Sequence, residues 1–161
     1  MCPNTPRRVP CRSKVICSVW LFRLLLGDPL ADLVLSDSAA GSQVSVRAYN
    51  HALGESGVSW VATKEIATRL RKGFPDSLKD QSLLLPTQNT VLRRSVEQWL
   101  EEQSFDANVV AEIEDSALLK ILATQGLGLA PVADAVLKDV EQQYDLHPVG
   151  PLRGVQMQFF A

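Results

Sequence analysis

Cysteine is confined to the very start of this chain of 161 residues. Cys2, Cys11 and Cys17 lie within the first 17 residues, and no cysteine follows them. Their spacing contains no close Cys-x-x-Cys pair and no histidine lies near them, so it does not fit a zinc site. An odd number of cysteines does not form a disulfide framework. We therefore expect no metal site and no structural disulfide.

Acidic residues are missing from residues 1–27, which carry five basic side chains. Residues 28–161 contain the other 11 Lys and Arg together with all 18 Asp and Glu, which gives them a net charge of −7. Nucleic acids are bound largely through Lys and Arg side chains that neutralise phosphates. The acidic body of the chain is therefore a poor partner for DNA.

Long apolar runs are absent as well. The apolar stretch Val15–Phe22 is interrupted by Arg23, whereas a membrane-spanning helix needs about 20 consecutive apolar residues. The basic start followed by this stretch resembles a signal peptide, but no small-residue cleavage site follows it. We expect a cytoplasmic protein with no membrane partner, and export remains an alternative.

Motifs of catalysis and of nucleotide binding are also lacking. The sequence has no Gly-x-Ser-x-Gly elbow, and His51 and His147 are its only histidines. The segment Gly126-Leu127-Gly128 lacks the third glycine of a dinucleotide loop and begins a predicted strand. We interpret Gly126 as a helix C-cap. We expect neither enzyme activity nor a cofactor, and a small α/β enzyme that uses one of the histidines remains an alternative.

The sequence does contain a regular alternation of strands and helices, which is typical of a mainly parallel α/β sheet. The last helix is predicted to begin at Val132, with Val136 and Val140 on its apolar face. Gly150-Pro151 is predicted as a turn before the final strand. The predicted strands are 32–37, 43–50, 56–62, 83–85, 109–113, 126–131, 146–149 and 155–160, and the predicted helices are 63–72, 91–102, one that begins near 117, and 132–143.

Local signals mark the ends of two of these helices. Thr63 is a natural N-cap for the helix 63–72, and Gly73 is a natural C-cap with Pro75 beyond it. The helix 91–102 is expected to bury four residues whose spacing places them on one face. These are Leu92, Val96, Trp99 and Leu100.

Polar residues follow several predicted strands where a helix begins. Ligands bind outside the carboxyl ends of strands in an α/β sheet, because helix N-termini there offer unpaired N–H groups and a positive dipole end. Each residue also has an ordinary structural interpretation, since Thr, Asn and Asp are common N-caps and Pro131 would start its helix. The predicted ligand-binding residues are Ser36, Asp37, Thr87, Gln88, Asn89, Thr90, Asp115, Ser116 and Pro131.

Four segments carry a resemblance through their order and spacing. They are Asp-Leu-Val-Leu-Ser-Asp at 32–37, the stretch 49–58, Gly-Phe-Pro at 73–75 before Leu-Leu-Pro-Thr at 84–87, and Glu-Asp-Ser-Ala-Leu-Leu-Lys at 114–120. Together they resemble the effector-binding domain of LysR-type transcriptional regulators, over about Leu26 to Ala161.

This resemblance implies a type-2 periplasmic-binding-protein-like α/β fold, with two subdomains joined by two crossing strands and an effector cleft between them. It implies that Asp32–Ser36 is the outgoing hinge strand and Val155–Phe160 the returning one. Residues 43–149 would form one complete second subdomain, and only remnants of the other would be present.

The resemblance does not extend to residues 1–25, which we expect to be irregular or disordered. A DNA-reading helix cannot be placed there, so DNA binding is implied only through an N-terminal domain absent from this chain. The resemblance also implies a homo-oligomer for the full-length regulator.

Within the family, the four segments are most similar to an activator of sodium/proton antiporter genes. This similarity implies a small-molecule or ion effector and a response to sodium, lithium or alkaline pH. The leading hypothesis is a truncated effector-sensing regulatory domain that is not an enzyme. The alternatives are an exported solute-binding protein of the same fold and a small α/β enzyme.

Overall fold

The structure, a computed structural model, is organised as two compact units, which are described separately below. The first unit comprises Met1–Ala52 and Phe159–Ala161, and the second comprises Leu53–Gln158. Within this chain, the residues that the structure describes are 15–17, 33–37 and 50–161.

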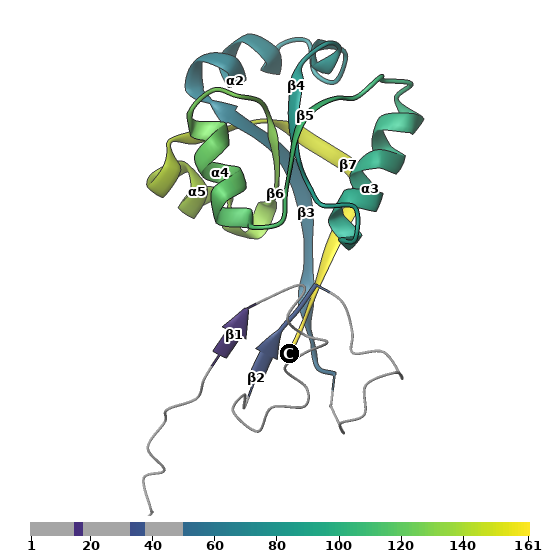
Figure 1. The fold of residues 1–161 in the computed structure, drawn as a ribbon, viewed down its shortest axis with the longest axis vertical. Helices are drawn as coiled ribbons and strands as arrows, with labels where there is room; N and C mark the ends of the chain where they lie inside the picture. Colours follow the sequence, from purple (N-terminus) through teal and green to yellow (C-terminus); the bar gives the residue numbers. More distant parts are fainter. Residues whose placement is uncertain (1–14, 18–32, 38–49) are drawn as a thin grey trace, which may run out of the picture. The chain divides into compact units, whose positions relative to one another are not determined.

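Two long strands, β3 (Ala52–Thr63) and β7 (Leu146–Phe160), contain the boundaries between the units (Figure 1). The chain therefore leaves the first unit at the start of β3, whereas we expected Asp32–Ser36 to be the outgoing strand. The second unit begins ten residues later than the expected range 43–149 and ends nine residues later.

The first unit contains a short parallel pair, β1 (Val15–Cys17) with β2 (Leu33–Leu35). Next to β2, Ser36 forms an isolated antiparallel bridge with Phe160, in which each backbone N–H donates to the other carbonyl at 3.0 and 2.9 Å. The predicted strand 32–37 is thus present as β2 and this bridge. The predicted strand 43–50 falls almost wholly outside the described residues. Of residues 1–25, expected to be irregular, three form β1 and the others lie outside the described residues.

The second unit is built on strands of both directions. Strand β4 (Ser82–Pro86) pairs in parallel with β5 (Asn108–Ile113), as expected. Strand β6 (Ala130–Ala133) pairs antiparallel with β3, which in turn lies next to β7. A parallel bridge between Leu83 and Leu129 connects β4 to the segment that enters β6. The sheet is therefore mixed rather than mainly parallel.

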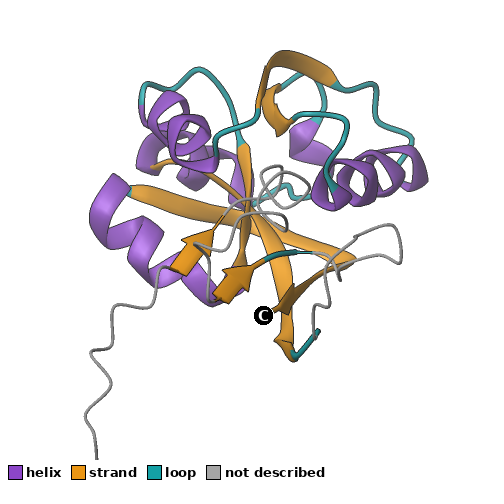
Figure 2. Ribbon diagram, turned by 60° about the horizontal axis from the view of Figure 1, so that its bottom comes forward, coloured by secondary structure: helices purple, strands orange, loops and turns teal. Residues whose placement is uncertain are grey.

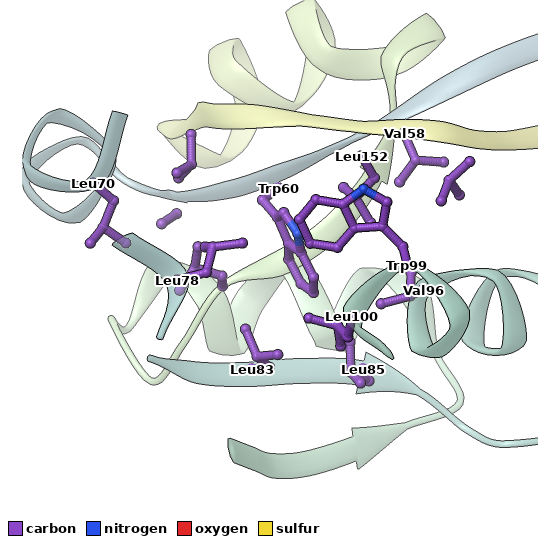
Figure 3. Packing of buried hydrophobic residues seen from close by; sticks show 14 of the residues in the cluster. Val58, Trp60, Leu70, Leu78, Leu83, Leu85, Val96, Trp99, Leu100 and Leu152 are labelled. Atoms are coloured by element: carbon purple, nitrogen blue, oxygen red, sulfur yellow. The ribbon is translucent and has the colours of Figure 1, made fainter. Parts of the chain in front are cut away.

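Successive residues of these strands bury their side chains in two different clusters, because side chains in a strand alternate between faces. Trp60 and Leu85 belong to one cluster, and Val61 and Leu84 belong to the other. Figure 3 shows the first cluster from close by. Both faces of the sheet are thus apolar and need cover.

Helices supply that cover (Figure 2). The first cluster includes residues of α2 (Lys64–Arg71), the 3-10 turn η1 (Asp76–Leu78) and α3 (Val91–Glu102). The second includes residues of α4 (Ser116–Thr124) and α5 (Leu137–Tyr144). The second unit is therefore a sheet with helices packed on both faces.

The region of the predicted last helix differs most from expectation. Val132 and Pro131 lie in β6, opposite Ser59 and Trp60 of β3, so Pro131 does not start a helix. A 3-10 turn, η2 (Asp134–Val136), comes next, and Val136 is 42% exposed. Pairing with β3 buries all four residues of β6, which outweighs the preference of proline for a first helical position.

Gly150-Pro151 is not a turn, because β7 continues without a break from Leu146 to Phe160. Gly150 lies against the ring of Phe74, and a Cβ atom added to it would meet Phe74 Cδ1 at 2.5 Å. The glycine is present for close packing, and Pro151 is tolerated in a strand that ends the sheet order.

Helix α3 has the predicted bounds. It buries Val96, Trp99 and Leu100, and Leu92 is partly buried against the same cluster. Thr63 stands at the N-cap position of α2, but its side chain forms no capping hydrogen bond. Gly126 has φ +74° just after α4, as a C-terminal glycine should.

Candidate functional site

Polar segments gather at one edge of the sheet in the second unit. Parallel strands β4 and β5 end together, since Pro86 pairs with Ile113, and the parallel bridge at Leu83 and Leu129 gives β6 the same direction. The segments that follow these three strands therefore share an edge. We call this site the carboxyl edge and define it by Thr87–Thr90, Glu114–Ser116 and Asp134.

The first segment of the carboxyl edge is a tight turn between β4 and α3. The Thr90 hydroxyl donates to the Thr87 carbonyl at 3.0 Å and accepts from the Arg93 N–H at 3.1 Å, and Thr90 is buried. Its hydroxyl thus serves as the N-cap of α3. Gln88 and Asn89 are exposed, and the Thr87 hydroxyl donates to Asn89 Oδ1 at 2.7 Å. These three residues are the part of the turn that a ligand can reach.

The second segment is the N-terminus of α4. The Oδ1 atom of Asp115 accepts from the N–H groups of Ala117 and Leu118, both at 2.7 Å. Asp115 is therefore an N-cap, as its ordinary structural interpretation predicted, and Ser116 is the exposed first residue of the helix. Burial lowers the pKa of Lys120, one turn further on, and the charge of Asp115 opposes this shift.

The cap at Asp115 leads to a stability prediction. Asp115→Ala should lower the free energy of unfolding by about 1 kcal/mol, because two N–H groups of α4 lose their acceptor. Asp115→Asn, which keeps a side-chain oxygen, should cost less. Urea denaturation followed by circular dichroism measures both, and equal losses for the two variants would contradict the capping role.

The third segment contains a residue that our sequence interpretation did not select, Asp134. It follows β6, and its Oδ1 accepts from the buried Ser59 hydroxyl at 2.6 Å. Nearby, the Ser56 hydroxyl accepts from the Ala135 N–H at 3.0 Å. A Cβ atom on Gly57 would collide with Asp134 Oδ2, so this carboxylate packs directly on β3. We missed Asp134 because we placed the end of β6, and the start of the helix, too early.

Arg93 is the second residue that the sequence interpretation missed. Its side chain is only 5% exposed and makes three polar contacts. Nε donates to Glu97 Oε1 at 2.7 Å, Nη1 donates to the Pro86 carbonyl at 3.0 Å, and Nη2 lies 2.8 Å from Glu112 Oε1. The sequence feature that could have identified Arg93 is its position on the buried face of α3, three residues before Val96 and seven before Leu100.

The remaining predicted residues lie elsewhere. Ser36 and Asp37 belong to the first unit, where Ser36 is buried and Asp37 partly buried. Pro131 is buried inside β6 rather than in a turn after it. Of the predicted ligand-binding residues, the carboxyl edge of the second unit therefore brings together Thr87–Thr90, Asp115 and Ser116.

The described residues hold no group of three or more His, Cys, Asp and Glu side chains that could bind a metal ion. His147, the second residue of β7, lies between two carboxylates, 2.8 Å from Glu141 and 2.9 Å from Asp145. No helix in the described part of the chain is both long enough and apolar enough to cross a membrane.

Comparisons with known proteins bear on this fold. The profile of the family described as LysR substrate binding domain matches residues 25–159. The Transcriptional activator protein NhaR of Escherichia coli (strain K12) is 29% identical over 89 residues, which are 55% of this chain and 29% of that protein. This chain thus matches less than a third of the length of that relative.

Solved structures share the fold. The regulatory domain of CcmR from Synechocystis PCC6803, in complex with 2-PG, has a TM-score of 0.63 at 12% identity, over 89% of this chain and 68% of that one. The reduced regulatory domain of OxyR2 from Vibrio vulnificus has a TM-score of 0.62 at 13% identity, over 89% and 68%. These likenesses confirm the expected α/β, periplasmic-binding-protein-like fold. Because the family profile covers most of its length, the chain belongs to the LysR substrate-binding domain family, the effector-binding part of transcriptional regulators rather than an enzyme family.

Proposed function

We propose that this chain senses a small-molecule or ion effector at the carboxyl edge, as the regulatory part of a transcriptional activator that responds to sodium or alkaline stress. The family supports the sensing role, and the similarity to NhaR, a transcriptional activator, supports activation. One observation carries the proposal. Two polar turns lie at the ends of the adjacent parallel strands β4 and β5, and each leads into a capped helix N-terminus.

The chemistry of the carboxyl edge suits a small polar effector. The Thr87 hydroxyl and the amides of Gln88 and Asn89 offer neutral hydrogen bonds, and the N-termini of α3 and α4 favour an anionic group. Glu114 and Asp134 are exposed carboxylates that favour a cation. Sodium is the first probe, because the four segments of the sequence resemble an activator of sodium/proton antiporter genes.

The same proposal extends to the whole regulator. We propose that it acts in the cytoplasm, that it binds DNA through a separate domain, and that it assembles as a homo-oligomer. Effector binding would shift the equilibrium between two arrangements of the regulator, and so change its action on DNA.

NMR spectra of the purified chain test the site directly. We expect that replacing KCl with NaCl at constant ionic strength shifts the amide signals of Thr87–Thr90 and of Asp115–Ser116. Asn89→Ala removes one oxygen and should weaken the response by about 2- to 10-fold in apparent affinity, as the loss of one hydrogen bond implies.

Thr68→Val is the matched control for general damage to the chain, because among the described residues the Thr68 hydroxyl bonds only its own helix, at the Lys64 carbonyl 2.7 Å away. This variant should respond to sodium as the parent chain does. Sodium shifts that avoid the carboxyl edge, or that survive Asn89→Ala unchanged, would contradict the proposed site.

A further inference from the structure

Arg93 connects both ends of the turn Thr87–Thr90. Its side chain holds the residue before the turn, through the 3.0 Å hydrogen bond to the Pro86 carbonyl. Its backbone N–H holds the last residue of the turn, through the 3.1 Å hydrogen bond to the Thr90 hydroxyl. The Thr90 hydroxyl in turn donates to the Thr87 carbonyl. Arg93 of α3 thus holds both ends of this turn.

The same side chain reaches the neighbouring strand. Nη2 of Arg93 lies 2.8 Å from Glu112 Oε1, and Glu112 stands on β5 three residues before Asp115. A continuous path of polar contacts therefore runs from Thr87 through Thr90 and Arg93 to Glu112. This path links the first polar turn of the carboxyl edge to β5, the strand that leads into the second turn.

The geometry of the guanidinium is what makes three such contacts possible. A guanidinium presents five N–H donors in a rigid planar fork, whereas a lysine ammonium is a compact charge at the end of a flexible stem. A lysine at this position would keep the charge, but it could not reach the Pro86 carbonyl, Glu97 and Glu112 in the same fixed geometry. A buried arginine with all these partners is costly to replace by a group that leaves them unpaired.

From this arrangement we infer that Arg93 is the positioning residue of the effector site: it holds the turn Thr87–Thr90 in its binding conformation and joins it to β5. The inference rests on the proposed function for its biological meaning. It requires no contact between Arg93 and the effector. The expected effect is local, since the guanidinium bonds the residue before the turn and the backbone N–H of Arg93 bonds the last residue of the turn.

Native-state hydrogen exchange tests the positioning role without any ligand. Arg93→Lys should speed exchange of the Thr90 and Arg93 amides at least tenfold, while the amide of Leu70 in α2 changes little. Arg94→Lys is the matched control, because Arg94 is the next residue of the same helix and is exposed; it should leave all three amides unchanged. Equal acceleration at Thr90 and Leu70 would overturn the inference, because it would mean that Arg93 only stabilises the unit as a whole.

Glu112→Gln provides a second, milder variant that keeps the shape of the side chain. We expect it to speed Thr90 exchange in the parent chain and to add less than twofold in the Arg93→Lys background, because the path is already broken there. Fully additive effects would overturn the inference.

Sodium titration of Arg93→Lys completes the test: if the parent chain binds sodium, the variant should bind at least fivefold more weakly. Failure of the parent to bind would count against the proposed effector, and the exchange result would still decide the role of Arg93.

Discussion

Gly128→Ala should lower the free energy of unfolding by about 2–4 kcal/mol, from overpacking against backbone and from weakened hydrogen bonds between strands. A Cβ atom at position 128 would lie 2.6 Å from the Ser82 carbonyl oxygen and 2.9 Å from its carbon. The same oxygen accepts from the Leu129 N–H at 2.9 Å, and Leu129 accepts from the Leu84 N–H at 2.8 Å. Backbone atoms cannot swing aside, so the two segments must move apart.

The damage should reach the carboxyl edge, because the contact of Leu129 with β4 is what gives β4 and β6 their common alignment. Urea denaturation of the purified chain measures the loss. Gly73→Ala is the control, since its added Cβ would meet only side-chain atoms of Ser77, the nearer of them Cβ at 3.3 Å. We expect that variant to stay within about 1 kcal/mol of the parent. If both alanine variants were equally stable, the close approach at Gly128 would not be a constraint.

Helix α3 shows how much local signals can establish. Thr90 offers a hydroxyl at the N-cap, and apolar residues recur at helical spacing from Leu92 to Leu100. Cap, periodicity and burial all point to the same helix, so its bounds could be predicted from the sequence. The polar turn before it could be predicted for the same reason, because it connects a strand and a helix that are both clearly marked.

Elements that depend on distant partners could not be predicted in this way. Pro131 is a good first residue of a helix, and Gly150-Pro151 is a good turn, if only neighbours in the sequence are considered. In the structure β3 draws Pro131 into a strand, and the ring of Phe74 occupies the space that a side chain at Gly150 would need. Residues far away in the chain decide both places.

The residues of the candidate site fall into the same two groups, those marked by local signals and those that depend on distant partners. The turns at Thr87–Thr90 and Asp115–Ser116 were predictable because each is a local junction. Asp134 and Arg93 were not selected, since the role of each depends on a partner in another element: Ser59 for Asp134, and Glu112 for Arg93. From the sequence alone, an arginine on the apolar face of a predicted helix looks like an exception to the helical pattern. Its role becomes clear only when its ion-pair partner on the neighbouring strand is known.

Trp60→Ala should produce the largest loss of stability in the second unit, about 3–5 kcal/mol. Trp60 has no exposed surface, and it lies in the same buried cluster as Trp99, Leu83 and Leu85 (Figure 3). Removing the indole would leave a cavity between the sheet and the helices that cover this face, and rigid strands on one side limit its collapse. The thermal midpoint and the urea midpoint of the chain should both fall.

Trp60→Phe separates the packing of the ring from its polar atom. The Nε1 atom of Trp60 is buried and has no hydrogen-bond partner among the described residues. Phenylalanine keeps an aromatic ring and removes this unsatisfied N–H group, whose burial costs about 1–3 kcal/mol. The relief offsets part of the lost packing, so we expect Trp60→Phe to cost less than about 1.5 kcal/mol. If it cost as much as Trp60→Ala, the indole N–H would have to be bonded, most simply to a buried water, and the core would depend on that bond rather than on the volume of the ring.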